Sequence, residues 1–301
     1  MHITWKDKFV ERYSKLTDFE IFKEYSMKPL RKSIRVNTLK ISIPDLKKRI
    51  PYPLTPIPWC KEGFFIEGRG IGNLVEHTLG YFYMQEAASM IPPLVLEPKE
   101  NEIVLDMAAA PGSKTTQIAA MMKNTGVLIA NDVEVPRLKA LSINLQRCGI
   151  LNTVMTFQQG KNFRNLECDK ILLDAPCSGT GTIRKSPKTP LIWNPNAIKR
   201  LAGMQRQLIK VAFENLKEDG TLVYSTCSLE PEENEGVIDF LLKEYKNAKL
   251  EKIELNIKRS PAILAFEKHT FDPSIKYCLR LWPQDNDTEG FFVAKIRKIT
   301  S

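Results

Sequence analysis

Two cysteines end two segments of the chain that have the composition of buried strands. Cys177 closes 170-KILLDAPC-177, and Cys227 closes 221-TLVYSTC-227. Both segments are rich in leucine and β-branched residues, which is typical of strands in a parallel sheet. Because ligands bind beyond the carboxyl ends of such strands, the two thiols could face one pocket. The alternative is that both are small buried side chains, a common role of free cysteine.

A loop of small residues follows a third strand-like segment and indicates a ligand-binding turn. Residues 103–105 are apolar, and the chain continues as 106-DMAAAPGSK-114 into an amphipathic helix. Glycine lets the backbone approach a ligand closely, and the helix N-terminus offers free N–H groups. The spacing of Gly112 and Lys114 is not that of a Walker A loop, and the segment has no G-x-G-x-x-G motif.

Asp132 ends the next strand-like segment, 126-GVLIAND-132. A carboxylate at such a position commonly binds ribose hydroxyls, although a turn residue would account for it equally well. The presence of Asp106 in the same crevice favours the binding role. An acid of this kind beside a loop without a phosphate cradle predicts a nucleoside-like cofactor that lacks a pyrophosphate, such as S-adenosylmethionine.

Strands and helices alternate from residue 85 onward, and this alternation would bring the side chains above to one edge of a sheet. The pattern predicts an α/β fold with a doubly wound, mostly parallel sheet. Helices are expected at 195–217 and at 232–245, where the acidic start suits the helix dipole. Two strand-like segments without a helix between them, 277–283 and 290–298, predict an antiparallel hairpin at the edge of the sheet.

Residues 1–84 are rich in lysine and arginine and lack the regular alternation of strands and helices that follows. They are expected to form a small basic α/β subdomain, with residues 85–301 forming the larger domain. The prolines of 51-PYPLTPIPW-59 predict an extended connection rather than a core element. Arg35 and Asn37 lie in a strand-like segment, where a solvated strand face would account for two polar residues.

The composition of the 301 residues predicts a soluble globular protein with a polyanionic partner. Hydrophobic residues make up 43% and charged residues 26%, and no apolar run is long enough to span a membrane. The net charge of +9 favours nucleic acid as a partner. The 6 cysteines are scattered and there are only 3 histidines, so neither a metal site nor a disulfide framework is expected. The charged N-terminal segment has no apolar core of a secretory signal, and we expect a cytoplasmic protein.

Four motifs together resemble those of one enzyme family. They are, in order, DMAAAPGSKT, NDVEVPRLKAL, LLDAPCSGTGTIRK and STCSLEPEENE. Their order and spacing resemble the RNA (cytosine-5) methyltransferases of the Nop2/Sun (Fmu/NSUN) family over nearly the whole chain. The resemblance implies a seven-stranded Rossmann-like methyltransferase sheet, an N-terminal RNA-binding subdomain, and methyl transfer from S-adenosylmethionine to C5 of cytidine in RNA.

The same resemblance assigns roles to individual residues. Cys227 matches the cysteine that adds to C6 of cytosine, and Cys177 matches the one that assists release of the product. Asp174 matches a carboxylate that holds the cytosine edge, and Lys114 matches a residue near the same base. Gln159 replaces the family's usual aspartate, and we expect its amide to hydrogen-bond adenine instead. The expected cofactor site comprises Asp106, Ala108, Ala109, Ala110, Pro111, Gly112, Ser113, Lys114, Asp132, Arg137, Gln159 and Asp174.

The expected substrate is tRNA, because compact members of the family are often tRNA enzymes, and ribosomal RNA is the alternative. A non-catalytic RNA-binding or ribosome-assembly factor is a further alternative, which the retention of both cysteines, Asp174 and Lys114 disfavours. We expect the protein to act as a monomer. The target base must be unpaired or flipped out, because pyrimidine C5 is otherwise inaccessible. The expected phosphate-contacting residues are Arg31, Lys32, Arg35, Lys47, Lys48 and Arg49.

Overall fold

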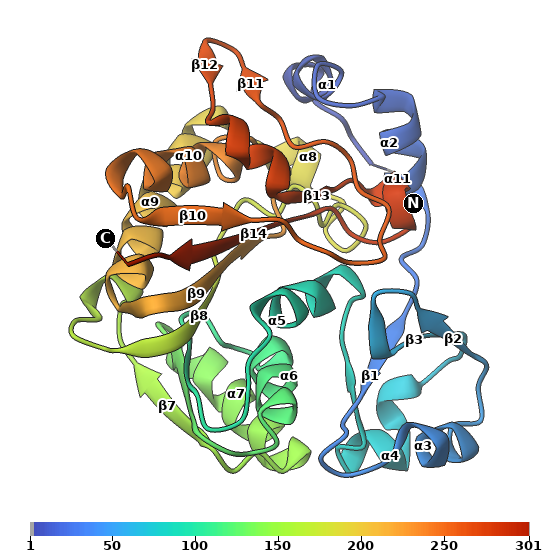
Figure 1. The fold of residues 1–301 in the computed structure, drawn as a ribbon. Coiled ribbons are helices and arrows are strands. Elements are labelled where there is room, and N and C mark those ends of the chain that lie inside the picture. The colour runs from blue at the N-terminus through green and yellow to red at the C-terminus, as the bar shows by residue number, and fades with distance from the viewer. Residues whose placement is uncertain (1–2, 301) are drawn as a thin grey trace.

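The computed structural model describes residues 3–300, and its central element is a large mixed sheet (Figure 1). Seven strands lie in the order β10-β14-β9-β8-β5-β6-β7, and β13 pairs with β14 outside this path. The strands β5 to β9 run parallel, which confirms the predicted α/β methyltransferase fold. The bounds are β5 Ile103–Asp106, β6 Val127–Asp132, β7 Thr153–Phe157, β8 Cys168–Asp174, β9 Leu216–Thr226, β10 Ala248–Glu251, β13 Leu279–Leu281 and β14 Phe291–Lys298.

The antiparallel end of the sheet differs in one respect from the prediction. β13 and β14 pair as expected. However, β14 does not form the edge, because it lies between β9 and β10 and is antiparallel to both. The outermost strand is β10, whose sequence 248-AKLE-251 is too short and too polar to stand out as a strand.

Helices cover both faces of the sheet because alternate residues of each strand point to opposite sides. Leu105 and Leu173 pack with α9 and α10, whereas Val104, Leu172 and Val223 pack with α5 and α6. The polar start of α9 is capped by Asn194, as predicted. The bounds are α5 Ile91–Leu96, α6 Ser113–Met121, α7 Val135–Cys148, α8 Thr189–Ile192, α9 Pro195–Glu214, α10 Glu235–Glu244 and α11 Pro283–Asn286. A small hairpin, β11 Ala265–Phe266 and β12 His269–Thr270, lies outside the sheet.

A second, smaller sheet lies beside the large one, in the order β2-β3-β1-β4, with a core of its own (Figure 1). The predicted extended connection at 51–59 is wrong in part, because it contains β2 and buries Ile57 and Trp59. The N-terminal elements are α1 Asp7–Tyr13, α2 Phe19–Met27, β1 Ser33–Val36, α3 Ile43–Arg49, β2 Leu54–Ile57, β3 Cys60–Ile66, α4 Val75–Thr78 and β4 Phe82–Met84.

The helices α1 and α2 pack against the larger domain rather than the small sheet. Phe9, Tyr13 and Phe22 share an aromatic cluster with Trp193 and Trp282. Residues 3–27 therefore contribute to a core that later segments complete, while the small sheet is built around β1. The division of the chain at residues 84 and 85 stays a prediction.

Arg35 and Asn37 are buried, so a solvated strand face does not explain them. Arg35 donates hydrogen bonds to the carbonyl of Ser113 at 2.8 Å and to Oγ1 of Thr116 at 2.8 Å. Asn37 donates to the carbonyl of Cys148 at 2.8 Å. Both residues connect the small sheet to α6 and α7. Arg35 is therefore unavailable as a phosphate-contacting residue.

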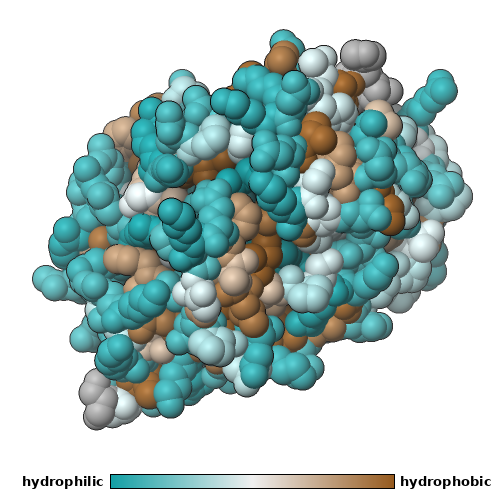
Figure 2. Space-filling view, turned by 90° about the horizontal axis from the view of Figure 1, so that it is seen from above, coloured by the Kyte–Doolittle hydropathy of each residue, from teal (hydrophilic) through white to brown (hydrophobic). Residues whose placement is uncertain are grey.

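One face of the molecule is largely polar. Figure 2 shows one face covered mostly by hydrophilic residues, with hydrophobic residues exposed in a strip near its middle. Within residues 3–300, no helix is both long enough and apolar enough to cross a membrane.

Candidate active site

The candidate site lies at the carboxyl ends of β5, β8 and β9. The strand order changes direction between β5 and β8, which is where open α/β sheets bind ligands. Asp106 ends β5 and Asp174 ends β8, while Cys227 directly follows β9. Cys177 lies in the turn after β8. The sheet topology thus gathers at one edge four side chains from three segments that are distant in the sequence.

The two thiols are in direct contact, with Sγ of Cys177 3.3 Å from Sγ of Cys227. Both side chains are partly accessible, unlike the other four cysteines, which are buried. The hydrogen bond with Cys227 and burial raise the pKa of Cys177 well above its ordinary value, and the charges of Cys227 and Glu233 act in the same direction. Cys177 therefore keeps its proton near neutral pH.

A lysine–carboxylate pair lies beside the thiols. Nζ of Lys114 is 2.6 Å from Oδ2 of Asp174 and 3.0 Å from Oγ of Ser89. The hydroxyl of Ser225 donates to the other oxygen of Asp174 at 2.7 Å. Burial lowers the pKa of Lys114, but Asp174 outweighs burial and raises it, and Asp106 and Cys227 act in the same direction as Asp174. The net result is a raised pKa, so Lys114 remains cationic.

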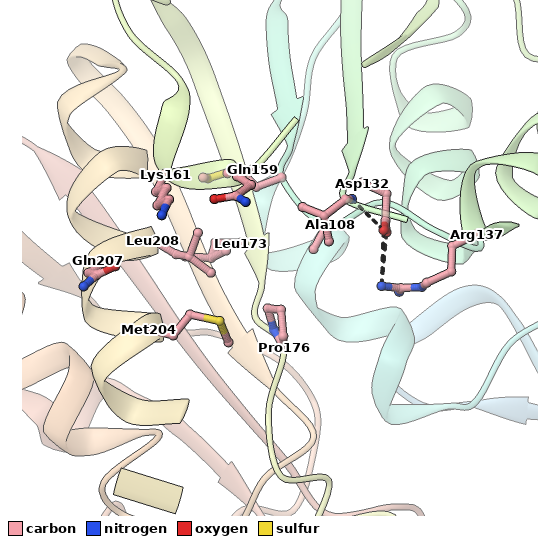
Figure 3. Close-up of a pocket in the computed structure, with 13 residues that line it drawn as sticks. Ala108, Asp132, Arg137, Gln159, Lys161, Leu173, Pro176, Met204, Gln207 and Leu208 are labelled. Carbon is pink, nitrogen blue, oxygen red and sulfur yellow. Dashed lines mark hydrogen bonds and ion pairs between the residues drawn. The ribbon is translucent and has the colours of Figure 1, made fainter. Parts of the chain in front are cut away.

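A cavity of about 370 Å³ opens next to the thiols and the Lys114–Asp174 pair, and Leu173 and Pro176 are part of its wall. Four of the predicted cofactor residues line it: Ala108, Asp132, Arg137 and Gln159 (Figure 3). In Figure 3 Asp132 is paired to Arg137 on one side of the space, and Met204, Gln207 and Leu208 of α9 lie on the other. Residues that the sequence did not single out complete the wall: Met107, Val133, Gly160, Lys161, Leu173, Pro176, Met204, Gln207 and Leu208.

Asp132 is held rigidly at the cavity wall. One of its carboxylate oxygens accepts from the backbone N–H of Val133 at 2.8 Å, and the other accepts from that of Ala110 at 3.2 Å. Arg137 lies 3.3 Å from the same carboxylate. The side chain is almost fully buried at the end of β6, so its direction toward the cavity is set by the turn rather than by solvent.

The rest of the predicted cofactor loop does not line the cavity. Ala109 is buried in a cluster with α7. The carbonyls of Ala110 and Pro111 accept from Arg137 and Asn144, both at distances of 2.8 to 2.9 Å. Gly112 has φ +108, and a Cβ there would come within 2.9 Å of Leu141 Cδ1. The loop is thus shaped by α7, and Ser113 is anchored by Arg35. Direct ligand contacts from these residues stay a prediction.

The sequence profile of the 16S rRNA methyltransferase RsmB/F family matches residues 93–297. The profile of the N-terminal domain of 16S rRNA methyltransferase RsmF matches residues 6–87. The chain belongs to the RsmB/F family of RNA cytosine-5 methyltransferases. This membership agrees with the two-cysteine motif pattern and with the site geometry above.

Relatives of this family member include both tRNA and rRNA enzymes. The chain is 48% identical to the tRNA (cytosine(49)-C(5))-methyltransferase of Pyrococcus abyssi, over 97% of this chain and 96% of that protein. It is 45% identical to the ribosomal RNA small subunit methyltransferase F of Shewanella piezotolerans, over 94% of this chain but only 60% of that protein.

Solved structures confirm the fold of this RsmB/F-family enzyme. The methyltransferase homolog protein from Pyrococcus horikoshii superimposes with a TM-score of 0.89 at 41% identity, covering 98% of this chain and 96% of the other. NSun6 from Pyrococcus horikoshii, crystallised with SFG, superimposes with a TM-score of 0.85 at 27% identity, covering 98% and 99% of the two chains.

The residues of this family member fit a nucleoside-containing methyl donor. The cavity volume lies within the usual range of about 300–1,000 Å³ for small-molecule sites. Its wall combines apolar side chains, such as Leu173 and Leu208, with the acid Asp132. In addition, Asp106 is buried, and its Oδ1 has no hydrogen-bond partner among residues 3–300. A buried acceptor without a partner is suited to a donor group on a ligand.

Some of the cavity-wall residues that the sequence analysis did not predict lie at positions that the sequence of this RsmB/F-family member does indicate. Met204 and Leu208 are four residues apart on the apolar side of α9, so the sequence places them together but does not show that they face a cavity. Pro176 directly precedes Cys177, and Leu173 precedes Asp174. Pro176 and Leu173 are expected at the cavity because ligands bind beyond the carboxyl ends of parallel strands. Val133 and Lys161 carry no sequence signal of this kind.

Proposed function

We propose that this enzyme transfers a methyl group from S-adenosylmethionine to C5 of a cytidine in tRNA. The contact between two partly accessible thiols at neighbouring strand ends carries the chemical part of the proposal. The match over 96% of the length of a tRNA enzyme supports the choice of tRNA. The family's RNA cytosine-5 chemistry needs an attacking thiolate, a group that binds the base and a methyl donor.

Cys227 is the proposed nucleophile. Cytosine C5 is a weak nucleophile because its electrons belong to an aromatic ring. When the Cys227 thiolate adds to C6, an S–C6 bond forms and the C5=C6 electron pair moves onto C5 and toward N3, which makes C5 enamine-like. That carbon can then take an electrophilic methyl group.

Lys114 and Asp174 are proposed to bind and polarise the base. Asp174 faces the thiols from the end of β8, where one oxygen is held by Ser225 and the other by Lys114. Its carboxylate can accept from the N4 amino group of cytosine, and a proton shared between the carboxylate and N3 would join it to the N3 edge. The ammonium of Lys114 offsets the negative charge that moves into the ring when Cys227 adds, which is electrostatic stabilisation of a transition state.

Cys177 is proposed to assist release of the product. After methyl transfer the C5 proton passes to a base in the pocket, its bonding electrons restore C5=C6, and the S–C6 bond breaks with its pair going to sulfur. The raised pKa of Cys177 keeps its thiol protonated at this stage. A thiol 3.3 Å away can donate a hydrogen bond to the departing Cys227 sulfur and so stabilise it.

S-adenosylmethionine, when bound, supplies a methyl group activated by a positively charged sulfur. We propose that the cavity beside Asp132 holds it. Asp132 would bind the ribose hydroxyls, Gln159 the adenine edge and Asp106 a donor group of the methionine part. The apolar side of α9, with Met204 and Leu208, would exclude water from the reacting face.

Ribosomal RNA is the second candidate substrate. It is favoured by the family profiles, both of which describe 16S rRNA methyltransferases. The chain spans 60% of the length of the rRNA relatives that it matches, however, and nearly all of the tRNA relative. A cytoplasmic, monomeric enzyme remains the expectation for either substrate.

Nucleoside analysis tests the proposal. The protein is incubated with isotopically labelled S-adenosylmethionine and either bulk tRNA or ribosomal RNA, and the RNA is then digested. Labelled 5-methylcytidine in the tRNA pool is expected. Label in ribosomal RNA alone would favour the second candidate, and no 5-methylcytidine in either pool would contradict the enzymatic function and favour a non-catalytic RNA-binding factor.

A further inference from the structure

Glu233 is a fully buried carboxylate between β9 and α10 that no step above uses. Its Oε2 accepts from the backbone N–H of Ser178 at 2.9 Å and from Nε2 of Gln205 at 2.8 Å. Its Oε1 accepts from the hydroxyl of Ser228 at 2.9 Å and also from the hydroxyl of Ser178. No lysine or arginine within residues 3–300 forms an ion pair with it. One uncompensated buried charge is thus surrounded by four donors.

Two of the residues that donate to Glu233 directly follow the two cysteines in the sequence. Ser178 directly follows Cys177, and Ser228 directly follows Cys227. One carboxylate therefore links the two turns that carry the thiols. The two serine hydroxyls lie 3.1 Å apart, because both donate to the same carboxylate oxygen. On the other side of Cys177, Gln205 donates to the carbonyl of Pro176 at 2.8 Å, so α9 holds the same turn.

The neighbouring glutamates in the segment have different partners. Glu230 accepts from Tyr13, Trp193 and Arg12, and Glu232 pairs with Arg12, so both bind the N-terminal helix α1. Glu235 forms a fully buried ion pair with Arg280. These carboxylates are neutralised by arginine, whereas Glu233 alone among them contacts the cysteine turns.

We propose that Glu233 is a positioning residue that clamps the Cys177 turn to the Cys227 turn and thereby holds the two thiols in contact for release of the product. The inference rests on the proposed function, because it assigns to Glu233 the alignment that release requires. Separating the thiols by about 1 Å would remove the hydrogen bond between them, since a sulfur hydrogen bond extends to only about 4 Å and weakens steeply with misalignment.

The negative charge of Glu233 supports release of the product in addition to the hydrogen bonds that Glu233 accepts. The negative carboxylate favours the protonated form of Cys177 and so adds to the effect of Cys227 on the Cys177 pKa. Besides Cys227 and Glu233, Tyr224 lies near this thiol, with its phenol donating to the Glu233 carbonyl at 2.6 Å. The clamp and the charge can be separated by mutation.

Glu233→Gln removes the charge but can keep the clamp. Its amide oxygen can accept from Ser178 N–H and Gln205, as Oε2 does. Its amide nitrogen can donate to the hydroxyls of Ser178 and Ser228, because a hydroxyl rotates to serve as acceptor. Glu233→Ala removes both the charge and the clamp. Glu232→Gln is the matched control, because it neutralises an adjacent carboxylate that does not contact either turn.

The readout is the covalent protein–RNA adduct that survives denaturation, measured together with turnover on the full-length enzyme and tRNA. Glu233→Ala should lower turnover about 100-fold, as a misplacement near 1 Å does, and should accumulate adduct to the level of Cys177→Ala. The double variant Cys177→Ala/Glu233→Ala should accumulate no more adduct than Cys177→Ala alone. Glu233→Gln should restore at least a tenth of wild-type turnover, and Glu232→Gln should behave as wild type.

The outcomes separate the clamp from a general structural role. If Glu233→Ala loses activity without accumulating adduct, while Cys177→Ala does accumulate it, Glu233 serves the fold or the attack step and the inference is wrong. Equal losses in Glu233→Gln and Glu233→Ala would also contradict the clamp. Wild-type protein that forms no 5-methylcytidine would instead contradict the proposed function itself.

Discussion

Replacing Asp106 with asparagine should raise the stability of the ligand-free enzyme at alkaline pH. Asp106 is buried at the end of β5, and one of its oxygens accepts from the hydroxyl of Thr115 at 2.8 Å. Burial raises its pKa from the ordinary 3.8 to about 7. Between these two values the folded protein binds more protons than the unfolded chain. The free energy of unfolding therefore falls as the pH rises from 4 to 7.

The size of this effect follows from the two pKa values. A shift of one unit corresponds to about 1.4 kcal/mol, and integration of the linkage relation between pH 5 and pH 8 gives roughly 2.5 kcal/mol. Asparagine does not titrate in this range, and its amide can keep the contact with Thr115. The free energy of unfolding of Asp106→Asn, relative to wild type, should therefore increase by roughly 2.5 kcal/mol from pH 5 to pH 8.

Urea denaturation of both proteins at the two pH values measures this difference. Asp169→Asn is a suitable control, because burial opposes ionisation of Asp169 but the N–H of Ile103 and the ammonium of Lys217 outweigh it and lower its pKa. A lowered pKa lies below the whole measured range, so the effect of Asp169→Asn should be nearly constant from pH 5 to pH 8. An equally constant effect for Asp106→Asn would refute the reasoning.

Three further replacements test other parts of the site. Gln159→Asp introduces the family's usual carboxylate, and calorimetry should show cofactor binding at least as tight as in wild type; markedly weaker binding would mean that Gln159 is tuned to this cavity. Lys114→Met removes the cation 2.6 Å from Asp174 and should slow single-turnover methylation about 100-fold, whereas a rate within threefold of wild type would contradict the electrostatic role. Arg280→Met leaves Glu235 buried without its partner and should cost about 3–5 kcal/mol in urea denaturation, while an unchanged midpoint would contradict the pairing.

The positions of the chemical groups were largely predictable because they follow from strand ends. Asp106, Asp174 and Cys227 each lie within a residue of the end of a strand, and short apolar runs locate such ends well. In a parallel sheet these ends meet at one edge whatever the details of packing. The contact between Cys177 and Cys227 needed only the further fact that β8 and β9 are neighbours.

The remaining features depend on contacts between distant segments. The acidic residues at the start of 232–245 predict a favourable interaction with the helix dipole, but α10 begins only at Glu235. Glu230 and Glu233 are instead buried and hydrogen-bonded to other elements. The strand-like segment 33–38 predicts a solvated Arg35, but Arg35 extends from β1 to hydrogen-bond Ser113 and Thr116 of α6. No local pattern distinguishes a buried, hydrogen-bonded charge from a solvated one, because the difference lies in partners on other elements, such as Thr116 for Arg35 and Ser178 for Glu233.

The identity of the residue that bonds to RNA tests the central claim most directly. Cys177→Ala is incubated with tRNA and S-adenosylmethionine, denatured and digested, and the nucleotide-bearing peptide is sequenced by mass spectrometry. The account predicts a single adduct on Cys227, and none when Cys227 is also replaced by alanine. An adduct on any other residue, or methylation that persists in Cys227→Ala, would contradict it.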